Sequence, residues 1–187
     1  MLKREIRVIG IDDSPFRKSQ QHDVLVVGSI FKGGLFLDGI ISTKITIDGD
    51  DATEKITVMI NKSKFRPQLQ CILLNGIAVG GFNVIDIKEL SKNTGLPVIV
   101  VIRKKPNIDL IKETLERIGK KEKIKLIEKA GSIAPIGNLF VQLSGLSIEK
   151  AKEILKITCT RSLIPEPIRM SHLIASGIAD GESRGKA

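Results

Sequence analysis

Acidic side chains gather in two parts of the first third of the chain. Asp12 and Asp13 close an apolar stretch, EIRVIGID, and a second group follows later in the sequence: Asp38, Asp48, Asp50, Asp51 and Glu54. Carboxylate oxygens are the ligands that Mg²⁺ and Mn²⁺ prefer, and such a metal activates water and stabilises the leaving oxygen of a phosphodiester. The sequence therefore predicts a divalent-metal site at Asp12, completed by some of the later acids.

Some of these acids also have a purely structural interpretation. Asp51-Ala52-Thr53-Glu54 fits a capping box, with Asp51 at the N-cap of a helix and Glu54 at its third position. Asp12 precedes Asp13-Ser14-Pro15, so its side chain could serve a turn by bonding its own backbone. Both interpretations stay open from the residues alone.

Other polar residues could contact a substrate. His172 follows Pro165-Glu166-Pro167 near the start of the expected last helix. A histidine there is either a ligand or a structural residue whose hydrogen bonds are satisfied within the protein. Arg103, Lys104 and Lys105 leave a core strand at the end where open α/β sheets present ligands, so they either bind phosphate or are ordinary solvated charges. The pairs Gly33-Gly34 and Gly80-Gly81 match no nucleotide-binding pattern, which argues against a nucleotide cofactor.

The elements that must position these residues follow from apolar periodicity. Expected strands are residues 5–12, 23–31, 35–47, 69–79 and 98–102, with two short ones at 124–130 and 139–143. Helices are expected after Asp51, Asp86, Asn107 and Ser147, each of which suits an N-cap, and the tail forms a further helix with a frayed basic end.

Three strands without intervening helices, followed by alternating helices and strands, predict an α/β fold with a ribonuclease H-like mixed sheet flanked by helices. A flavodoxin-like doubly wound fold is the alternative, and the uninterrupted first three strands disfavour it. The length of 187 residues suits one core, so we expect a single domain over residues 1–187.

Composition favours an intracellular partner of negative charge. The net charge of +9 and the pI near 9.6 suit nucleic acid, although a lysine-rich surface also serves solubility. Cys71 and Cys159 lie far apart among apolar residues, and no run reaches the roughly 20 apolar residues that span a bilayer. We therefore expect a cytoplasmic protein without a membrane partner. The oligomeric state is not indicated.

Several segments resemble known sequences. LIPEPIRMSHLIAS at residues 163–176, NGIAVGGFNVIDIKELSKNTGLPVIVVIRKK at 75–105 and Gly10-Ile11-Asp12 resemble endonuclease V. The strings GIDDSPF, LDGIISTKITIDG, GFNVIDI, PEPIRMSHLIA and GESRG resemble more closely the archaeal endonuclease V-like family associated with cutting DNA at deoxyuridine.

The resemblance implies a divalent-metal-dependent endodeoxyribonuclease of DNA repair that uses Mg²⁺ or Mn²⁺ and acts on deaminated bases. It implies Asp12 as the first metal ligand and His172 as the site histidine. The remaining ligand positions would fall to Asp48, Asp51 and Glu54, with Asp48 and Asp51 favoured. Phosphate contacts would come from Arg103, Lys104 and Arg169.

The chain also departs from the endonuclease V pattern. Asn75 stands where that family has a catalytic Asp, and no Tyr is present for the wedge that opens the duplex. Strand separation would then use Phe36 or the loop around Phe82. These departures keep two alternatives open: a non-catalytic nucleic-acid-binding protein of the same fold, and an enzyme acting on RNA.

Overall fold

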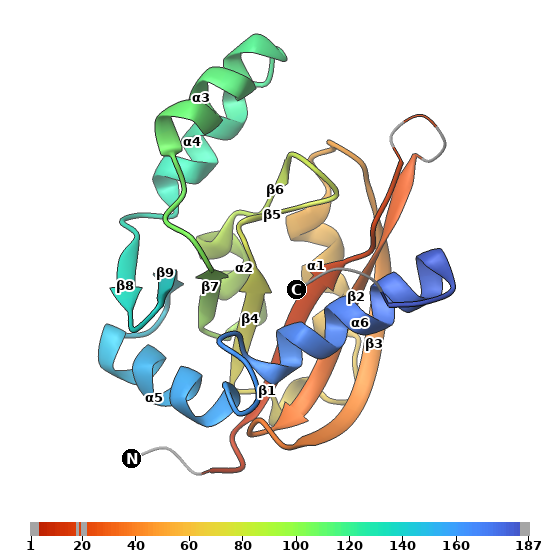
Figure 1. Ribbon diagram of the computed structural model, residues 1–187, viewed down its shortest axis with the longest axis vertical. Helices are drawn as coiled ribbons and strands as arrows, with labels where there is room; N and C mark the ends of the chain where they lie inside the picture. Colours follow the sequence, from red (N-terminus) through yellow and green to blue (C-terminus); the bar gives the residue numbers. More distant parts are fainter. Residues whose placement is uncertain (1–3, 18, 20–21, 184–187) are drawn as a thin grey trace.

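A seven-stranded mixed sheet forms the centre of the computed structural model, which describes residues 4–17, 19 and 22–183 (Figure 1). The strand order is β3-β2-β1-β4-β7-β9-β8. The strands of this sheet are β1 (Arg7–Asp13), β2 (Asp23–Lys32), β3 (Phe36–Thr46), β4 (Cys71–Asn75), β7 (Val98–Ile102), β8 (Ala134–Ile136) and β9 (Leu139–Ser144), while β5 (Ala78–Val79) and β6 (Asn83–Val84) pair separately.

Helices cover both faces of the sheet. The α-helices are α1 (Ala52–Asn61), α2 (Ile87–Thr94), α3 (Ile108–Arg117), α4 (Glu122–Lys129), α5 (Ile148–Thr158) and α6 (Glu166–Asp180), and a short 3₁₀ turn spans Arg66–Gln68. One core packs α1 and α2 against the sheet, and the other packs α5 and α6 against the opposite face. None of the described helices combines the length and the apolar character that a membrane crossing needs.

The predicted mixed sheet, with its first three strands in a meander, is confirmed. β1, β2 and β3 form an antiparallel meander, whereas β1, β4 and β7 run parallel. The antiparallel half excludes a doubly wound flavodoxin-like sheet, in which parallel strands are joined by helices. The parallel strands end at one edge of the sheet, so polar residues that follow them lie together there.

Two sequence predictions about strands were wrong. Residues 124–129 belong to helix α4 and Ala130 is its C-cap, and Lys123 and Ile127 are buried at the i,i+4 spacing of one helix face. The expected strand at 69–79 is divided, since β4 ends at Asn75 and Gly80 and Gly81 turn the chain between β5 and β6. The last four residues of the expected basic tail, 184–187, lie outside the described residues.

Predicted helix caps are largely confirmed. The Asp86 side chain accepts from the backbone N–H groups of Lys88 and Glu89 at the start of α2. Asn107 caps α3 and Ser147 caps α5 in the same manner. These side-chain oxygens satisfy backbone donors that a helix leaves unpaired in its first turn.

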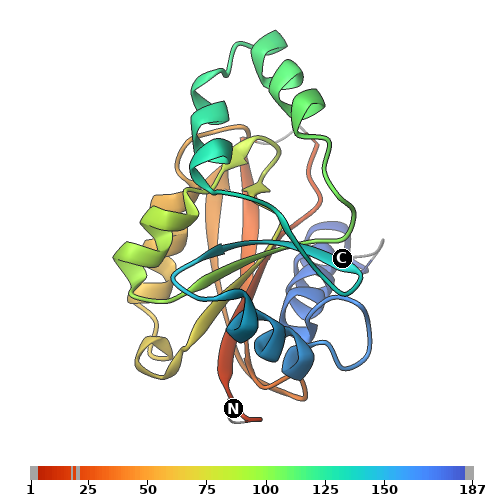
Figure 2. The same cartoon turned by 90° about the vertical axis from the view of Figure 1, so that its left-hand side faces the viewer.

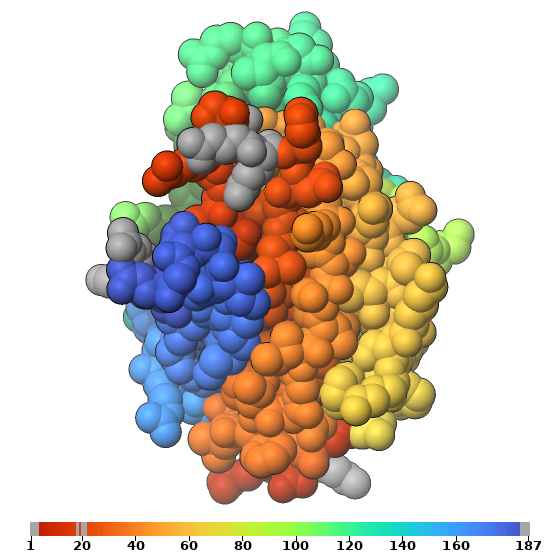
Figure 3. Space-filling view, turned by 90° about the vertical axis from the view of Figure 1, so that its right-hand side faces the viewer, coloured from red at the N-terminus to blue at the C-terminus, as the bar shows by residue number. Residues whose placement is uncertain are grey.

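Helix α6 lies directly on β1 and β2, beside the surface formed by β2 and β3 (Figure 3). Gly10 permits this approach, because a Cβ there would collide with the backbone of Pro167 and Ile168. Buried hydrogen bonds fix the register: the Ser171 hydroxyl donates to the Gly10 carbonyl, and the Ser29 N–H donates to Ser171 Oγ. The helix therefore has one possible position along β1.

We predict that Gly10→Ala destabilises the protein by about 1–3 kcal/mol, because the added methyl group overpacks the contact between α6 and β1. Gly177→Ala on α6 is the matched control. It lies in a helix with room for a Cβ, so it should leave stability unchanged or raise it by about 0.5–1 kcal/mol. Urea unfolding of both variants measures the difference. Equal stability of Gly10→Ala and the wild type would contradict this packing.

Candidate functional site

Asp12 and His172 meet at the edge where the parallel strands end. Their atoms Oδ2 and Nδ1 are 3.0 Å apart, although the residues are separated by 160 positions in the chain. The side chains are 5% and 17% exposed, respectively. Asn75, at the end of β4, donates from Nδ2 to the same Asp12 oxygen over 3.0 Å. Three different elements therefore converge on one carboxylate.

The Asp12 carboxylate is nearly saturated with donors. Oδ2 faces both His172 and Asn75, and Oδ1 accepts from the Asp13 N–H over 3.0 Å. An ionised carboxylate offers about four acceptor positions. About one position therefore remains for a further donor or a cation.

Asp13 points to the other face of the sheet, since successive residues of a strand alternate. Its Oδ2 accepts from the backbone N–H of Gly80 over 2.9 Å. Burial, with a smaller contribution from the neighbouring Asp12 charge, raises the pKa of Asp13 to about 6. Asp12 and Asp13 thus belong to separate networks despite their adjacency.

Asp48 belongs to the network of Asp13. Its Oδ1 accepts from the Phe82 N–H over 2.8 Å, and its own N–H donates to the Gly80 carbonyl. The φ angle of Asp48 is 53°, a left-handed conformation that costs a non-glycine residue energy. Asp48 therefore fixes the turn around Gly80 and Phe82. Nothing in this geometry brings its carboxylate to Asp12.

Asp51 occupies the predicted N-cap position of α1, but its side chain does not cap the helix as the capping-box interpretation expected. Its carboxylate accepts from the Thr46 N–H, the Thr46 hydroxyl and the Asn83 amide, and makes no cap bond. Partial burial opposes ionisation, but the hydrogen bonds from Asn83 and Thr46 outweigh it and lower the pKa of Asp51. Asn83 instead accepts from the Ala52 N–H at the start of α1. Glu54 is exposed on the first turn of that helix.

The four carboxylates expected to bind a metal are therefore not gathered into one centre. Over the described residues, no group of three or more His, Cys, Asp and Glu side chains is arranged to hold a metal ion. The physical reason is that Asp51 and Asp48 are committed to loop contacts on the α1 side of the sheet, whereas Asp12 faces α6.

The predicted basic residues are distributed around the same edge. Arg103 and Lys104 are exposed and follow β7, whose Val101 is paired with Asn75. Arg169 precedes His172 by almost one turn on α6, and its Nε and Nη2 donate to Glu166 Oε2 over 3.0 and 2.7 Å. Glu166 is buried, and its hydrogen bond raises the pKa of Arg169. The guanidinium of Arg169 is therefore held in one orientation.

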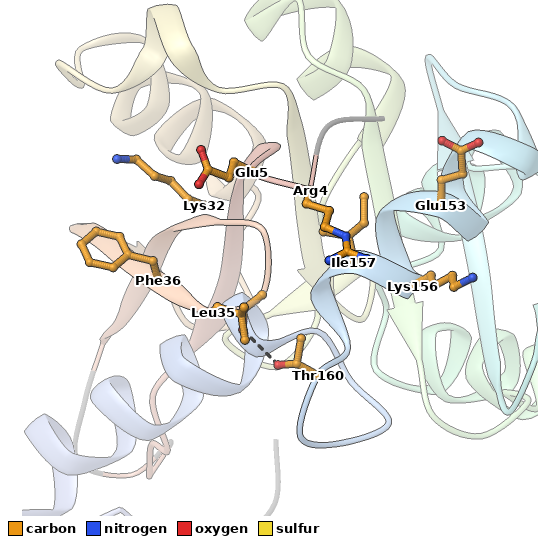
Figure 4. Close-up of a pocket in the computed structure, with 10 residues that line it drawn as sticks. Arg4, Glu5, Lys32, Leu35, Phe36, Glu153, Lys156, Ile157 and Thr160 are labelled. Atoms are coloured by element: carbon orange, nitrogen blue, oxygen red, sulfur yellow. Dashed lines mark hydrogen bonds between the residues drawn. The ribbon is translucent and has the colours of Figure 1, made fainter. Parts of the chain in front are cut away.

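Phe36 cannot act as a wedge beside Asp12. It pairs with Lys32, which in turn pairs with Arg7 at the start of β1, so it lies at the opposite edge of the sheet. There it lines a cavity of about 1020 Å³ together with Leu35, Ile157 and Lys156 (Figure 4). Phe82, in contrast, follows the Gly80 turn that Asp13 contacts.

Two features of the site were not predicted from the sequence. The first is that Asp12 and Asp13 lie on opposite faces of the sheet, which the alternation of side chains along a strand could have indicated. The second is the burial of Lys123, which the sequence does not indicate because this residue is one lysine in a run of lysines. Its ammonium donates to the carbonyls of Asp48, Gly49 and Phe82.

Comparison with known proteins identifies the family. The sequence model of the family described as endonuclease dU matches residues 4–179. The chain belongs to the endonuclease dU family. A UPF0215 protein of Methanothermobacter thermautotrophicus is 49% identical over 191 residues, which cover 100% of this chain and 94% of the relative.

Solved structures agree with the fold. A protein of unknown function from Archaeoglobus fulgidus has a TM-score of 0.87 and 39% identity, over 92% of this chain and 98% of that one. Ciona intestinalis endonuclease V, in complex with a 24-mer DNA containing an inosine followed by a ribo-adenosine, has a TM-score of 0.57 and 18% identity, over 89% and 82%. The likeness to endonuclease V shows that this member of the endonuclease dU family has the ribonuclease H-like fold.

The raised pKa of Asp13 predicts a pH-dependent stability. The folded protein holds this proton up to about pH 6, whereas the unfolded chain releases it near 3.8. Stability therefore falls as the pH rises through this interval and stays lower at neutral pH. Asp13→Asn should be more stable than the wild type by on the order of 1–3 kcal/mol near neutral pH. The gain should shrink towards pH 4. Denaturant unfolding of both proteins in EDTA, from about pH 4 to 7.5, tests this; a pH-independent difference would contradict it.

The corrected role of Asp51 gives a second prediction. Asp51→Ala should cost about 1–2 kcal/mol of folding free energy, because Thr46 and Asn83 lose a charged acceptor. Glu54→Ala, on the exposed face of α1, should change stability by less than about 0.5 kcal/mol. Thermal and urea unfolding compare the two. Equal effects would mean that Asp51 does not hold the loop.

Proposed function

We propose that the protein is an endonuclease that hydrolyses a phosphodiester of DNA near a deaminated base, with deoxyuridine as the favoured lesion and DNA repair as the context. The family description names deoxyuridine, and the endonuclease V neighbour was crystallised with DNA that contains inosine. The basic composition suits a polyanionic substrate.

The observation that carries the proposal is the contact between Asp12 and His172. A carboxylate that accepts a hydrogen bond from Nδ1 fixes the imidazole tautomer and leaves Nε2 as the basic nitrogen. The two side chains come from opposite ends of the chain and are mostly buried, yet they meet where the sheet presents its strand ends. A histidine arranged in this way is suited to proton transfer.

In the proposed reaction, the oxygen of a water molecule attacks the phosphorus atom and the bond from phosphorus to one sugar oxygen breaks. His172 Nε2 accepts the proton that the water loses, and the departing sugar oxygen takes a proton from solvent. Asp12 keeps its charge and stabilises the imidazolium that forms. Arg169, whose orientation Glu166 fixes, lies on the same helix and binds a neighbouring phosphate together with Arg103 and Lys104.

The residues present fit a divalent cation only if the substrate completes its coordination. Mg²⁺ is commonly bound by one or two carboxylates together with waters and substrate phosphates. Asp12, with its remaining acceptor position, and the amide oxygen of Asn75 would hold such an ion. Bound there, Mg²⁺ or Mn²⁺ would neutralise phosphate charge and lower the pKa of a water molecule. Asp48, Asp51 and Glu54 have no part in this proposal.

A second candidate function is nucleic-acid binding without hydrolysis. Asn75 favours it, because its amide donates to Asp12 where a second carboxylate would strengthen metal binding. This candidate predicts salt-dependent binding with no turnover. DNA and RNA oligonucleotides assayed side by side also decide between the two kinds of substrate.

We predict that the wild type cuts a deoxyuridine-containing duplex in Mg²⁺ or Mn²⁺ and not in EDTA. Asp12→Asn and His172→Ala should each lower kcat by about 100-fold or more, because proton transfer typically contributes that factor. Steady-state and single-turnover cleavage of uracil-, inosine- and abasic-containing substrates measure kcat and the rate of the chemical step. Thermal unfolding of each variant shows whether it is folded.

Asp180→Asn is the matched control for Asp12→Asn. Asp180 is exposed at the end of α6, the helix that carries His172, so its neutralisation should leave kcat within about twofold because it is remote from the reacting atoms. Undiminished cleavage by folded Asp12→Asn would refute the proposed chemistry. Binding without cleavage of any substrate would leave the second candidate.

A further inference from the structure

Helices α3 and α4 form a hairpin that stands above the sheet, on the side where β4 and β7 end (Figures 1 and 2). We call residues 107–130 the arm. It follows β7 through residues 103–106, and β7 runs parallel to β4, which ends at Asn75. The arm therefore rises from the same strand ends as the candidate site.

The segment from 103 to 130 is basic, with ten Lys and Arg residues against five Asp and Glu residues. Part of this charge is used within the protein. Lys112 pairs with Glu128, and Lys129 pairs with Asp86. Five other cations are exposed and form no ion pair within the described residues: Arg103, Lys104, Lys105, Arg117 and Lys125. Arg103, Lys104 and Lys105 lie in the segment that leads to the arm, whereas Arg117 and Lys125 belong to the arm itself.

A buried lysine fixes the arm to two loops beside the sheet. Lys123 is 1% exposed, and its Nζ lies 2.8 Å from the Phe82 carbonyl and 2.8 Å from Asp50 Oδ1. It also donates to the carbonyls of Asp48 and Gly49, and Lys120 donates to the Asp48 carbonyl as well. All these acceptors belong to the loop after β3 and to the turn between β5 and β6.

The same turn reaches the site edge. Gly80 donates to Asp13, and Asp48 bridges the Gly80 carbonyl and the Phe82 N–H. Below the lysines, Val84 packs against Leu115 of α3 and Ile127 of α4. Polar and apolar contacts together hold the arm in a fixed relation to the end of β1. A hairpin that moved freely relative to the sheet would need neither the polar nor the apolar contacts.

We propose that the arm binds the sugar–phosphate backbone of duplex DNA beside the scissile phosphate, with Arg117 and Lys125 as its phosphate contacts. This inference rests on the proposed function and extends it to a surface outside the Asp12–His172 pair. Exposed, unpaired cations release counterions when they neutralise phosphates, and a fixed mounting keeps the contacts at a constant distance from the site.

The test is the salt dependence of DNA binding. The dissociation constant of an unmodified duplex and of a deoxyuridine-containing duplex is measured from low to high KCl for the wild type and for Arg117→Gln/Lys125→Gln. Each phosphate contact contributes about 0.9 to the slope of log K against log salt, so the double variant should lose about two from the slope and bind several-fold more weakly on both duplexes. Both positions are exposed, so folding should be retained.

The matched control is Lys152→Gln/Lys156→Gln. These exposed lysines lie one turn apart on α5, which packs on the opposite face from the arm's mounting, so the same loss of charge should leave the slope near the wild-type value. A slope that falls equally in both double variants, or in neither, overturns the inference.

The outcomes for binding and cleavage are separable. A reduced slope in a protein that cuts no substrate supports the arm's role and refutes the proposed hydrolysis. Cleavage with an unchanged slope supports the hydrolysis and overturns the arm's role. A wild type that binds no DNA at any salt concentration refutes both.

Discussion

The close contact between α6 and β1 is the interaction on which the candidate site depends. The missing side chain of Gly10 lets the backbone at Pro167 approach the strand, and the buried hydroxyls of Ser29 and Ser171 fix the register. This register places His172 beside Asp12. A shift of the helix by one residue would rotate the imidazole by about 100° away from the carboxylate, since a helix turns once in 3.6 residues. The geometry of the site is thus set by residues with no chemical role of their own.

Strand alternation then divides the acidic residues between two faces. Asp12 faces α6 with His172 and Asn75, whereas Asp13 faces the turn at Gly80. Each network contains hydrogen-bonded carboxylates, and neither forms a cage of three metal ligands within the described part of the chain. The acidic residues that are close together in the sequence therefore do not form a site of several carboxylates at the strand end, where Asp12 faces His172. This is the reason why the proposed cation requires a phosphate from the substrate.

The sequence predicted the elements that depend on local patterns and missed those that depend on distant contacts. The caps at Asp86, Asn107 and Ser147 were predictable because cap and helix are adjacent. The pattern at Asp51 suggested a cap as well, but Asn83, far along the chain, took that role. Residues 124–130 suggested a strand because nothing local indicates that Lys123 is buried. The pairing of Asp12 with His172 followed only from likeness to a family, since no periodicity relates residues so far apart.

The burial of Lys123 explains why the arm is more than an extension of the surface. A buried ammonium is costly unless hydrogen bonds and a counter-charge replace its hydration, and here three carbonyls and Asp50 do so. The left-handed Asp48 adds a further cost. A leucine at position 123 would avoid these costs, but apolar packing is non-directional and would tolerate several orientations of the hairpin. Directed hydrogen bonds favour one orientation of the hairpin. A fixed orientation keeps the exposed cations of the arm at a constant position relative to His172, as the proposed DNA contact requires.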